Sequence, residues 1–295
     1  MAFAALVVAM VIWGSTFVVT KVTMQEFPPL TLAFLRFAIA SASLLVFMRG
    51  WQRVARLRQS LSLWRVAFLA STGIALFTAA FNYALVYGSA SQGALLYATT
   101  PAVVAVCAAL LLKERLDRRR MLGIALSIGG AVVVVLGGQA SLGNAPAPLL
   151  GALLMLSTVL LWGAYTVAAK RAAHADQLAV TFAISAVGAL ILLPASAIEL
   201  AASGFGATSA AGWLGVVYLG VFASAACYAF YNFALRQLDA STVGVYTNID
   251  PVVGVATAFM FLGEQLAIAQ AFGAAVVFAG MWLASTEPRR AVAVP

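Results

Sequence analysis

The stretch AAFNYAL at residues 79–85 returns as AFYNFAL at residues 229–235, so that Asn82 corresponds to Asn232 at an offset of 150. Other residues repeat in nearly the same register: Pro101 with Pro251, Glu114 with Glu264 and Gly123 with Gly273 at 150, and Trp13, Gly14 and Lys21 with Trp162, Gly163 and Lys170 at 149. So many matches in one register are hard to obtain by chance, even in apolar sequence. The chain is therefore predicted to consist of two related halves, residues 1–140 and 148–286.

The composition places both halves in a lipid bilayer. Of the 295 residues 64% are hydrophobic, with only 17 Lys and Arg and 9 Asp and Glu. Windows of about 20 largely apolar residues, the length that crosses a bilayer as a helix, recur along the chain. We expect an all-α integral membrane protein with ten transmembrane helices at residues 2–24, 28–48, 65–87, 90–113, 119–138, 148–170, 177–199, 211–235, 240–263 and 266–285.

The basic residues predict the orientation of these helices. With the N-terminus in the cytoplasm, 15 of the 17 Lys and Arg fall in cytoplasmic connectors, as the positive-inside rule requires. Both termini are then cytoplasmic. The net charge of +8 is accounted for by this topology, and no partner nucleic acid is expected, because no soluble domain exists to carry a basic face.

Five helices per half require the second half to insert upside down relative to the first. The connector between the fourth and fifth helices contains five basic residues, whereas the equivalent connector after Glu264 has none. Two inverted-topology five-helix repeats are typical of secondary transporters, in which the halves exchange conformations to alternate access. A channel needs no such exchange, and an intramembrane enzyme needs a catalytic constellation that the sequence lacks.

The motifs WGSTFVVTK (13–21), WGAYTVAAK (162–170), TTP (99–101), DP (250–251), KERL (113–116) and GEQL (263–266) support a family assignment. With ten spans in two EamA-type repeats, they resemble the drug/metabolite transporter (DMT) superfamily across the whole chain. Within it the sequence is most similar to bacterial exporters of amino acids, including the aromatic amino-acid exporters. The resemblance implies a carrier in the bacterial cytoplasmic (inner) membrane that exports amino acids or related small metabolites. The alternatives are a drug or other metabolite efflux carrier of the same fold and, in other classes, a channel or an intramembrane enzyme.

Polar and aromatic side chains within the spans indicate where a substrate cavity would lie, because lipid cannot satisfy polar groups. We infer a cavity lined by the first, third, fourth, sixth, eighth and ninth helices, with the fifth and tenth as outer scaffold. The candidate cavity residues are Trp162, Tyr246, Asn82, Asn232, Tyr97, Tyr228 and Tyr165. Each polar side chain could instead bond its own helix or brace a neighbour, and bracing is the favoured interpretation of the two repeat-related asparagines.

Three charged residues lie within the predicted spans, namely Lys21, Arg36 and Asp250. Thr100-Pro101 and Asp250-Pro251 are predicted to break their helices, since proline follows a good capping residue in both. Asp250 lies about 15 Å from the inner boundary, a depth that Arg36 could share. Three interpretations follow: a structural cap or ion pair with Arg36, a counter-charge for a substrate ammonium, or a proton-coupling acid.

Metal and cofactor chemistry find no support in the sequence. His174 is the single histidine, and Cys107 and Cys227 are isolated within predicted spans. We expect no metal, no cofactor and no enzymatic activity. The expected partners are a small-molecule substrate and the lipid bilayer, with the protein a monomer or homodimer.

Overall fold

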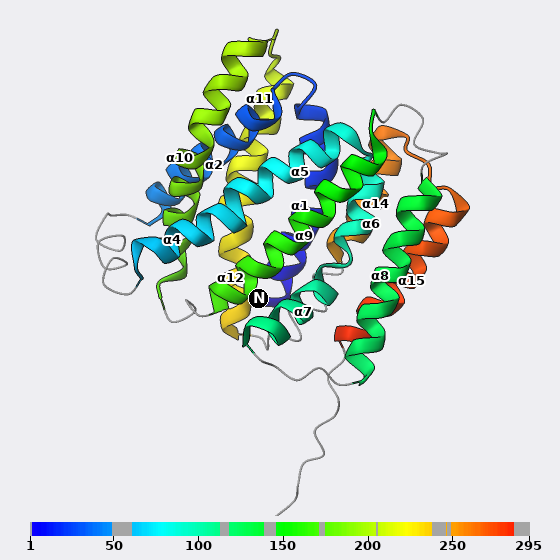
Figure 1. The fold of residues 1–295 in the computed structure, drawn as a ribbon. Coiled ribbons are helices and arrows are strands. Elements are labelled where there is room, and N and C mark those ends of the chain that lie inside the picture. Colours follow the sequence, from blue (N-terminus) through cyan, green and yellow to red (C-terminus); the bar gives the residue numbers. More distant parts are fainter. Residues whose placement is uncertain are drawn as a thin grey trace, which may run out of the picture.

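The computed structural model describes residues 2–48, 61–112, 118–138, 146–170, 175–204, 206–237, 246 and 249–285, and these form helices and connecting turns with no strand among them. The helices in chain order are α1 (Ala2–Thr23), α2 (Pro29–Phe47), α4 (Leu63–Ala70), η1 (Ser71–Ala75), α5 (Leu76–Tyr87), α6 (Ala90–Tyr97), α7 (Thr100–Leu112), α8 (Arg118–Gly138), α9 (Pro148–Lys170), α10 (Gln177–Ser203), α11 (Ala210–Val217), η2 (Tyr218–Ala226), α12 (Cys227–Gln237), α14 (Ile249–Leu262) and α15 (Ile268–Ser285). Figure 1 shows them packed as one bundle.

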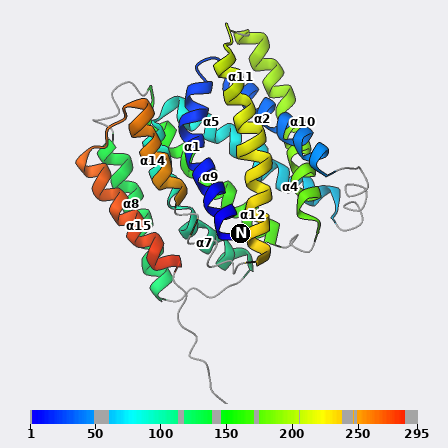
Figure 2. The same cartoon turned by 180° about the vertical axis from the view of Figure 1, so that it is seen from behind.

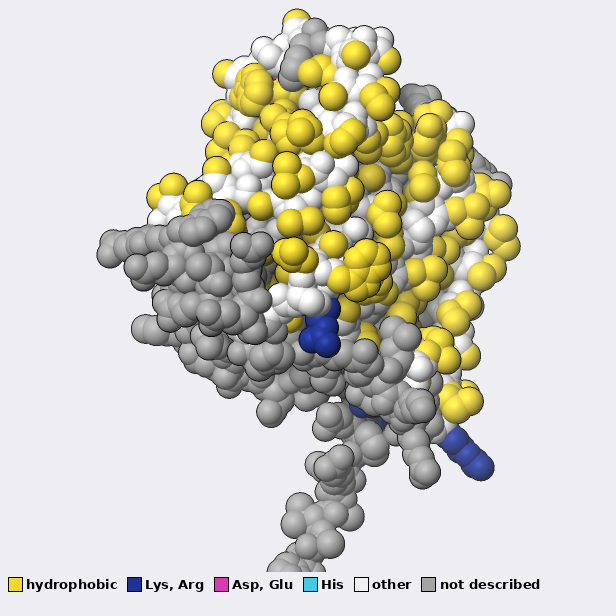
Figure 3. Space-filling view, turned by 60° about the vertical axis from the view of Figure 1, so that its left-hand side comes forward, with side chains coloured by type: hydrophobic (Ala, Val, Ile, Leu, Met, Phe, Trp, Pro, Cys, Tyr) yellow, Lys and Arg dark blue, Asp and Glu magenta, His cyan; other side chains and the backbone are white. Residues whose placement is uncertain are grey.

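Within this described part, eight helical segments are long and apolar enough to cross a membrane, and α14 and α15 are shorter apolar helices. Large apolar side chains cover the outward faces of several helices, among them Met121, Leu122 and Ile128 of α8, Leu190 and Ile198 of α10, and Phe259, Met260 and Phe261 of α14. Figure 3 shows one such face, hydrophobic over most of its height, with Lys and Arg only toward its lower end. Lipid rather than water suits this surface, so the chain is a multi-pass membrane protein.

Two of the helices that were predicted to be continuous each contain a π-helical segment, in which the helical turn is wider. The predicted span 65–87 is α4, the π-helical segment η1 and α5, while 211–235 is α11, the π-helical segment η2 and α12. In a π-helical segment backbone N–H groups donate to carbonyls five residues earlier, as the N–H of Leu76 does to the carbonyl of Ser71. The segments η1 and η2 fall at positions related by the sequence offset of 150.

The predicted span 90–113 is divided near its middle. Helix α6 ends at Tyr97 and α7 begins at Thr100, so Pro101 is the second residue of α7. The hydroxyl of Thr100 donates back to the carbonyl of Tyr97 and so links the two pieces. In the second half α14 begins at Ile249, which places Pro251 in its first turn, where a missing N–H costs nothing. Residues 240–245 of the predicted ninth span lie outside the described part.

Helices α8 and α15 pair along one edge of the bundle (Figures 1 and 2). Small residues let their backbones approach closely: a Cβ added at Gly130 would lie 2.8 Å from the carbonyl oxygen of Gly273, and one at Gly280 would lie 2.6 Å from that of Gly123. Gly137 faces Ala269 at the other end of the pair. The order of these contacts shows that α8 and α15 run antiparallel.

Three glutamates bind helix N-termini at the upper end of the bundle in Figure 1, where α1 and α10 end and α2 and α11 begin. Glu26 accepts from the backbone N–H of Ser209 before α11, Glu199 from Leu30 and Thr31 at the start of α2, and Glu264 from Ala90 and Ser91 at the start of α6. Helix N-termini favour negative charge because their N–H groups lack intrahelical partners. The helix ends here are therefore held together by carboxylates from other segments.

Candidate functional site

A small cavity lies at the centre of the bundle. Its volume is about 50 Å³, and its lining comes from α1, α2, α5, α6, α9, α12 and α14. The lining residues are Trp13, Thr16, Phe17, Arg36, Phe37, Phe77, Phe81, Tyr97, Trp162, Tyr228 and Asp250. Pockets that hold small ligands usually have volumes of about 300–1,000 Å³, so the cavity in this structure is too small for an amino acid.

Aromatic rings form most of the cavity wall. Trp13 and Trp162 meet edge to face with ring centroids 6.2 Å apart, and Tyr228 packs against both at 5.6 and 6.3 Å. On the other side, Phe77 contacts Trp162 at 5.4 Å and Tyr97 at 6.4 Å. Such ring contacts make the wall rigid, and the Tyr hydroxyl and Trp N–H groups are its polar atoms.

The two tryptophans are the residues that the repeat equates, and their surroundings repeat as well. A Cβ added at Gly14 would lie 2.6 Å from Cβ of Val253, and one added at Gly163 would lie 3.3 Å from Cγ1 of Val103. Val103 and Val253 differ by the repeat offset of 150. The helix pairs α1 with α14 and α9 with α7 therefore pack through residues at the same sequence offset, and Trp13 of one pair meets Trp162 of the other.

Arg36 enters the cavity from α2. Only 8% of its surface is exposed, its Nε donates to Ser224 Oγ at 2.8 Å, and its guanidinium lies 5.4 Å from the ring centre of Phe37. Ser224 is held in turn by η2, so the π-helical segment fixes the position of the arginine.

Asp250 enters the cavity from the first turn of α14, and 6% of its surface is exposed. Its Oδ1 is fully buried and has no hydrogen-bond partner. No ion pair joins Asp250 to Arg36, so the structure does not contain the pairing that the sequence left open.

Three other predicted cavity residues, Tyr165, Tyr246 and Asn82, are not among the described residues that line the cavity. Tyr165 packs behind the wall against Trp162 at 5.0 Å, and Tyr246 contacts Phe3 at 5.6 Å. Asn82 donates from Nδ2 to the carbonyl of Pro29 at 2.7 Å and so braces α5 against the start of α2. Asn232 belongs to α12, but its side chain lies outside the described part.

Lys21 lies at the upper end of α1 rather than in the cavity. Its Nζ donates to the carbonyl of Gly88 at 2.8 Å and lies 3.3 Å from Oε1 of Glu264. The side chain thus reaches polar partners near the helix ends, as a lysine near a membrane boundary does.

Sequence reasoning missed several lining residues, of which Trp13 and Phe77 are central. Trp13 could have been predicted, because it is the repeat partner of Trp162, which was already a candidate cavity residue. Helix α2 was not among the helices predicted to line the cavity, although its Arg36 was a candidate; Phe37 was missed because it is one apolar residue among many in that span.

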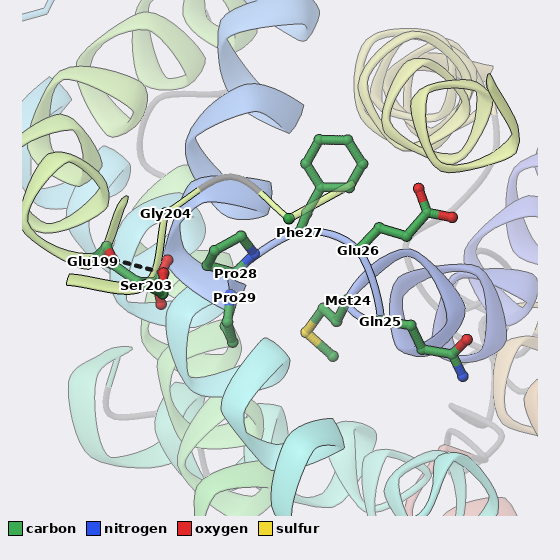
Figure 4. A pocket seen from close by; sticks show the side chains of 10 residues that line it. Met24, Gln25, Glu26, Phe27, Pro28, Pro29, Glu199, Ser203 and Gly204 are labelled. Atoms are coloured by element: carbon green, nitrogen blue, oxygen red, sulfur yellow. Dashed lines mark hydrogen bonds between the residues drawn. The ribbon is translucent and has the colours of Figure 1, made fainter. Parts of the chain in front are cut away.

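A larger cleft of about 360 Å³ opens at the upper end, outside the helical core (Figure 4). It is lined by the connector from Met24 to Pro29 and by the end of α10 with Glu199 and Ser203. The carboxylate of Glu199 already accepts three hydrogen bonds from Leu30 and Thr31, and Figure 4 shows Ser203 bonded to the Glu199 backbone. The central cavity, with its free carboxylate, is the stronger candidate for a substrate site.

The fold and the cavity define a class: a helical membrane protein whose bundle encloses an aromatic chamber with two buried ionisable side chains, Arg36 and Asp250. Residues 1–136 and 149–286 each match the EamA-like transporter family. The chain belongs to this family of the DMT superfamily and is a membrane transporter of that type.

Relatives of similar length accompany this assignment. The chain is 25% identical to the uncharacterized transporter YetK of Bacillus subtilis over 100% of this chain and 89% of the relative. It is 28% identical to a probable terminal-alkyne amino-acid exporter of Streptantibioticus cattleyicolor, with coverage of 95% and 91%, and 28% identical to a probable amino-acid metabolite efflux pump of Salmonella typhimurium, with coverage of 95% and 93%. A crystal structure with 22% sequence identity matches with a TM-score of 0.66 over 96% of both chains and so shares the fold.

Proposed function

We propose that this protein is a secondary transporter that exports amino acids, including aromatic and other neutral ones, or related small metabolites across the bacterial cytoplasmic membrane. Transport proceeds by alternating access of two inverted five-helix halves, residues 1–140 and 148–286, with both termini in the cytoplasm. The observation that carries the proposal is the meeting of Trp13 and Trp162, repeat-related residues, in the wall of the central cavity. A substrate site at the interface between two repeats is typical of secondary transporters.

The antiparallel pairing of α8 and α15 supports the inverted arrangement. These helices occupy equivalent places in the two halves, as the matched Gly123 and Gly273 indicate, and their contacts run in opposite directions. The names of relatives that are amino-acid exporters or efflux pumps support the substrate class.

Alternating access also gives the glutamate contacts a role. For the cavity to open toward the upper end, the bonds from Glu264 to α6 or from Glu199 to α2 have to break. Hydrogen bonds to charged groups contribute about 1.5–3 kcal/mol each, small enough to be exchanged during a transport cycle.

Efflux measurements test this function. Cells expressing the protein are preloaded with labelled amino acids, and release is compared with cells carrying an empty vector. Saturable release of at least one neutral amino acid is expected, and a flux that does not saturate would indicate a channel instead. A panel of lipophilic drugs belongs in the same screen, because the aromatic wall also suits such compounds. Release of drugs but of no amino acid would favour the drug-efflux alternative.

A further inference from the structure

Two opposite charges line the central cavity from different parts of the chain. Arg36 belongs to α2 and Asp250 to α14, and these helices lie on opposite sides of α1 (Figures 1 and 2). Both side chains are more than nine-tenths buried, and neither forms an ion pair with any residue in the described part of the chain. Unpaired charges buried within a membrane protein are costly, so they are expected to serve a ligand.

The guanidinium of Arg36 is anchored at one nitrogen and free at the other two. Its Nε donates to Ser224 Oγ, which fixes the plane of the group, and its two terminal nitrogens bond no described residue. A guanidinium held in this way presents a fork of N–H donors, whose geometry matches the two oxygens of a carboxylate.

The carboxylate of Asp250 has no hydrogen-bond donor in the described part of the chain, whereas Arg36 has N–H donors without an acceptor. Its Oδ1 is buried without a donor, and the first turn of α14 favours negative charge at this point. A carboxylate is an acceptor only, so the group that completes it is a donor, and an ammonium supplies three N–H groups together with the opposite charge.

The wall of the cavity suits the remainder of such a ligand. Trp13, Trp162, Tyr97 and Tyr228 line the same cavity as the two charges. Aromatic faces contribute apolar surface for a neutral or aromatic side chain and attract a cation that lies over them.

We propose that Arg36 and Asp250 are the two poles of a site for the zwitterionic backbone of an α-amino acid, with Arg36 binding the carboxylate and Asp250 the ammonium. This inference rests on the amino-acid transport proposed above and specifies the groups that are recognised. The cavity of about 50 Å³ has to widen before it admits the ligand. Since the two charges belong to different halves, a zwitterion bound to both draws the halves together and favours closure around the substrate.

The test uses the purified full-length protein in liposomes and three matched probes. L-Phenylalanine carries both charges, phenethylamine lacks the carboxylate, and 3-phenylpropionate lacks the ammonium. Inhibition of labelled L-phenylalanine flux by each unlabelled probe gives its apparent affinity. In the unaltered protein each truncated probe should bind about tenfold or more weakly than phenylalanine, because one buried charge is then left without its partner.

Two substitutions test which residue binds which charged group of the ligand. In Asp250→Asn the preference for phenylalanine over 3-phenylpropionate should fall about tenfold, while the preference over phenethylamine persists. In Arg36→Gln the preference for phenylalanine over phenethylamine should fall about tenfold, while the preference over 3-phenylpropionate persists. The control variants are Thr257→Val on α14 and Ser41→Ala on α2, whose hydroxyls bond only their own helices, and both should retain both preferences.

The outcomes separate this inference from the proposed function. Absence of saturable flux for all amino acids in the folded protein overturns the function. Saturable flux with both preferences unchanged in Asp250→Asn and Arg36→Gln overturns the two-pole site alone.

Thermal unfolding without ligand gives a second measurement for variants that transport poorly. Asp250→Asn removes a buried acid whose Oδ1 has no partner, so it should leave the melting temperature unchanged or raise it, whereas loss of a purely structural group would lower it. Addition of L-phenylalanine should raise the melting temperature of the unaltered protein more than that of either variant.

Discussion

Glu264 joins three elements at the upper end of the bundle. It accepts from the backbone N–H of Ala90 at 3.0 Å and of Ser91 at 2.8 Å, and it pairs with Lys21 of α1 at 3.3 Å. Burial alone would raise the pKa of this carboxyl, but the hydrogen bonds from Ser91 and Ala90 and the charge of Lys21 hold its pKa below the ordinary 4.5. The folded state therefore favours the ionised form.

This lowered pKa predicts how Glu264 contributes to stability. The contribution is fully present above pH 4.5, the ordinary value, and is lost as the pH falls through the lowered pKa of the folded state. Glu264→Gln keeps the size but removes the charge, so it should lower the unfolding free energy by about 1–3 kcal/mol at neutral pH. Thermal unfolding in detergent, repeated from pH 7 down to about pH 3, should also show a weaker loss of stability with acid in the variant.

Glu26→Gln is the matched control. Glu26 accepts from the backbone N–H and the hydroxyl of Ser209, the same chemistry as Glu264 with Ser91, but its contacts are exposed to solvent. Hydrogen bonds from Ser209 likewise lower the pKa of Glu26. Water competes with exposed contacts, so this variant should be closer to the unaltered protein. Equal losses in the two variants would contradict the role assigned to burial.

At the scale of the element, the packing of α8 on α15 depends on which glycine faces the partner. A Cβ at Gly130 would lie 2.7 Å from the backbone nitrogen of Val277, while a Cβ at the neighbouring Gly129 meets nothing within 4 Å. Gly130→Ala should therefore force the helices apart and destabilise the protein by about 1–3 kcal/mol. Gly129→Ala should stabilise it slightly, by up to about 1 kcal/mol, because alanine is the better helix former.

Melting temperatures of the two alanine variants, measured side by side in one detergent, check this prediction. The pair changes the same residue type by the same atom at adjacent positions of one helix, so any difference reports the contact with α15. A similar shift in both would show that the helices can separate without cost.

The helices themselves could be predicted from the sequence in their positions but not in their internal form. Hydropathy indicates how much of the chain crosses the lipid, so helices were predicted at 65–87 and 211–235, and the structure has them at 63–87 and 210–237. Hydropathy does not indicate which backbone groups bond to one another within these helices. The wider turn η2 depends on tertiary contact, since Ser224 within it bonds Arg36 of a helix distant in sequence.

At the scale of the whole molecule, the repeat was the most informative feature of the sequence, and it could have predicted a further residue of the cavity. The predicted Trp162, Tyr97, Tyr228 and Asp250 line the central cavity together, whereas Tyr246 does not. Depth in the bilayer could be estimated by counting residues, but the direction of a side chain depends on how helices rotate against their neighbours. Applying the repeat to Trp162 would have found Trp13.

The inverted arrangement itself is tested by the sidedness of two equivalent connectors. Arg118 begins α8 and Ile268 begins α15, and because these helices are antiparallel their first residues lie at opposite ends of the bundle (Figure 1). In a background with Cys107→Ala and Cys227→Ala, Ile268→Cys should react with a membrane-impermeant maleimide in intact cells whose outer surface is accessible. Arg118→Cys should react only after the membrane is opened, since the positive-inside rule predicts that the basic connector before α8 lies in the cytoplasm. Labelling of both positions from the same side would exclude inverted halves, and with them the exchange of conformations on which alternating access depends.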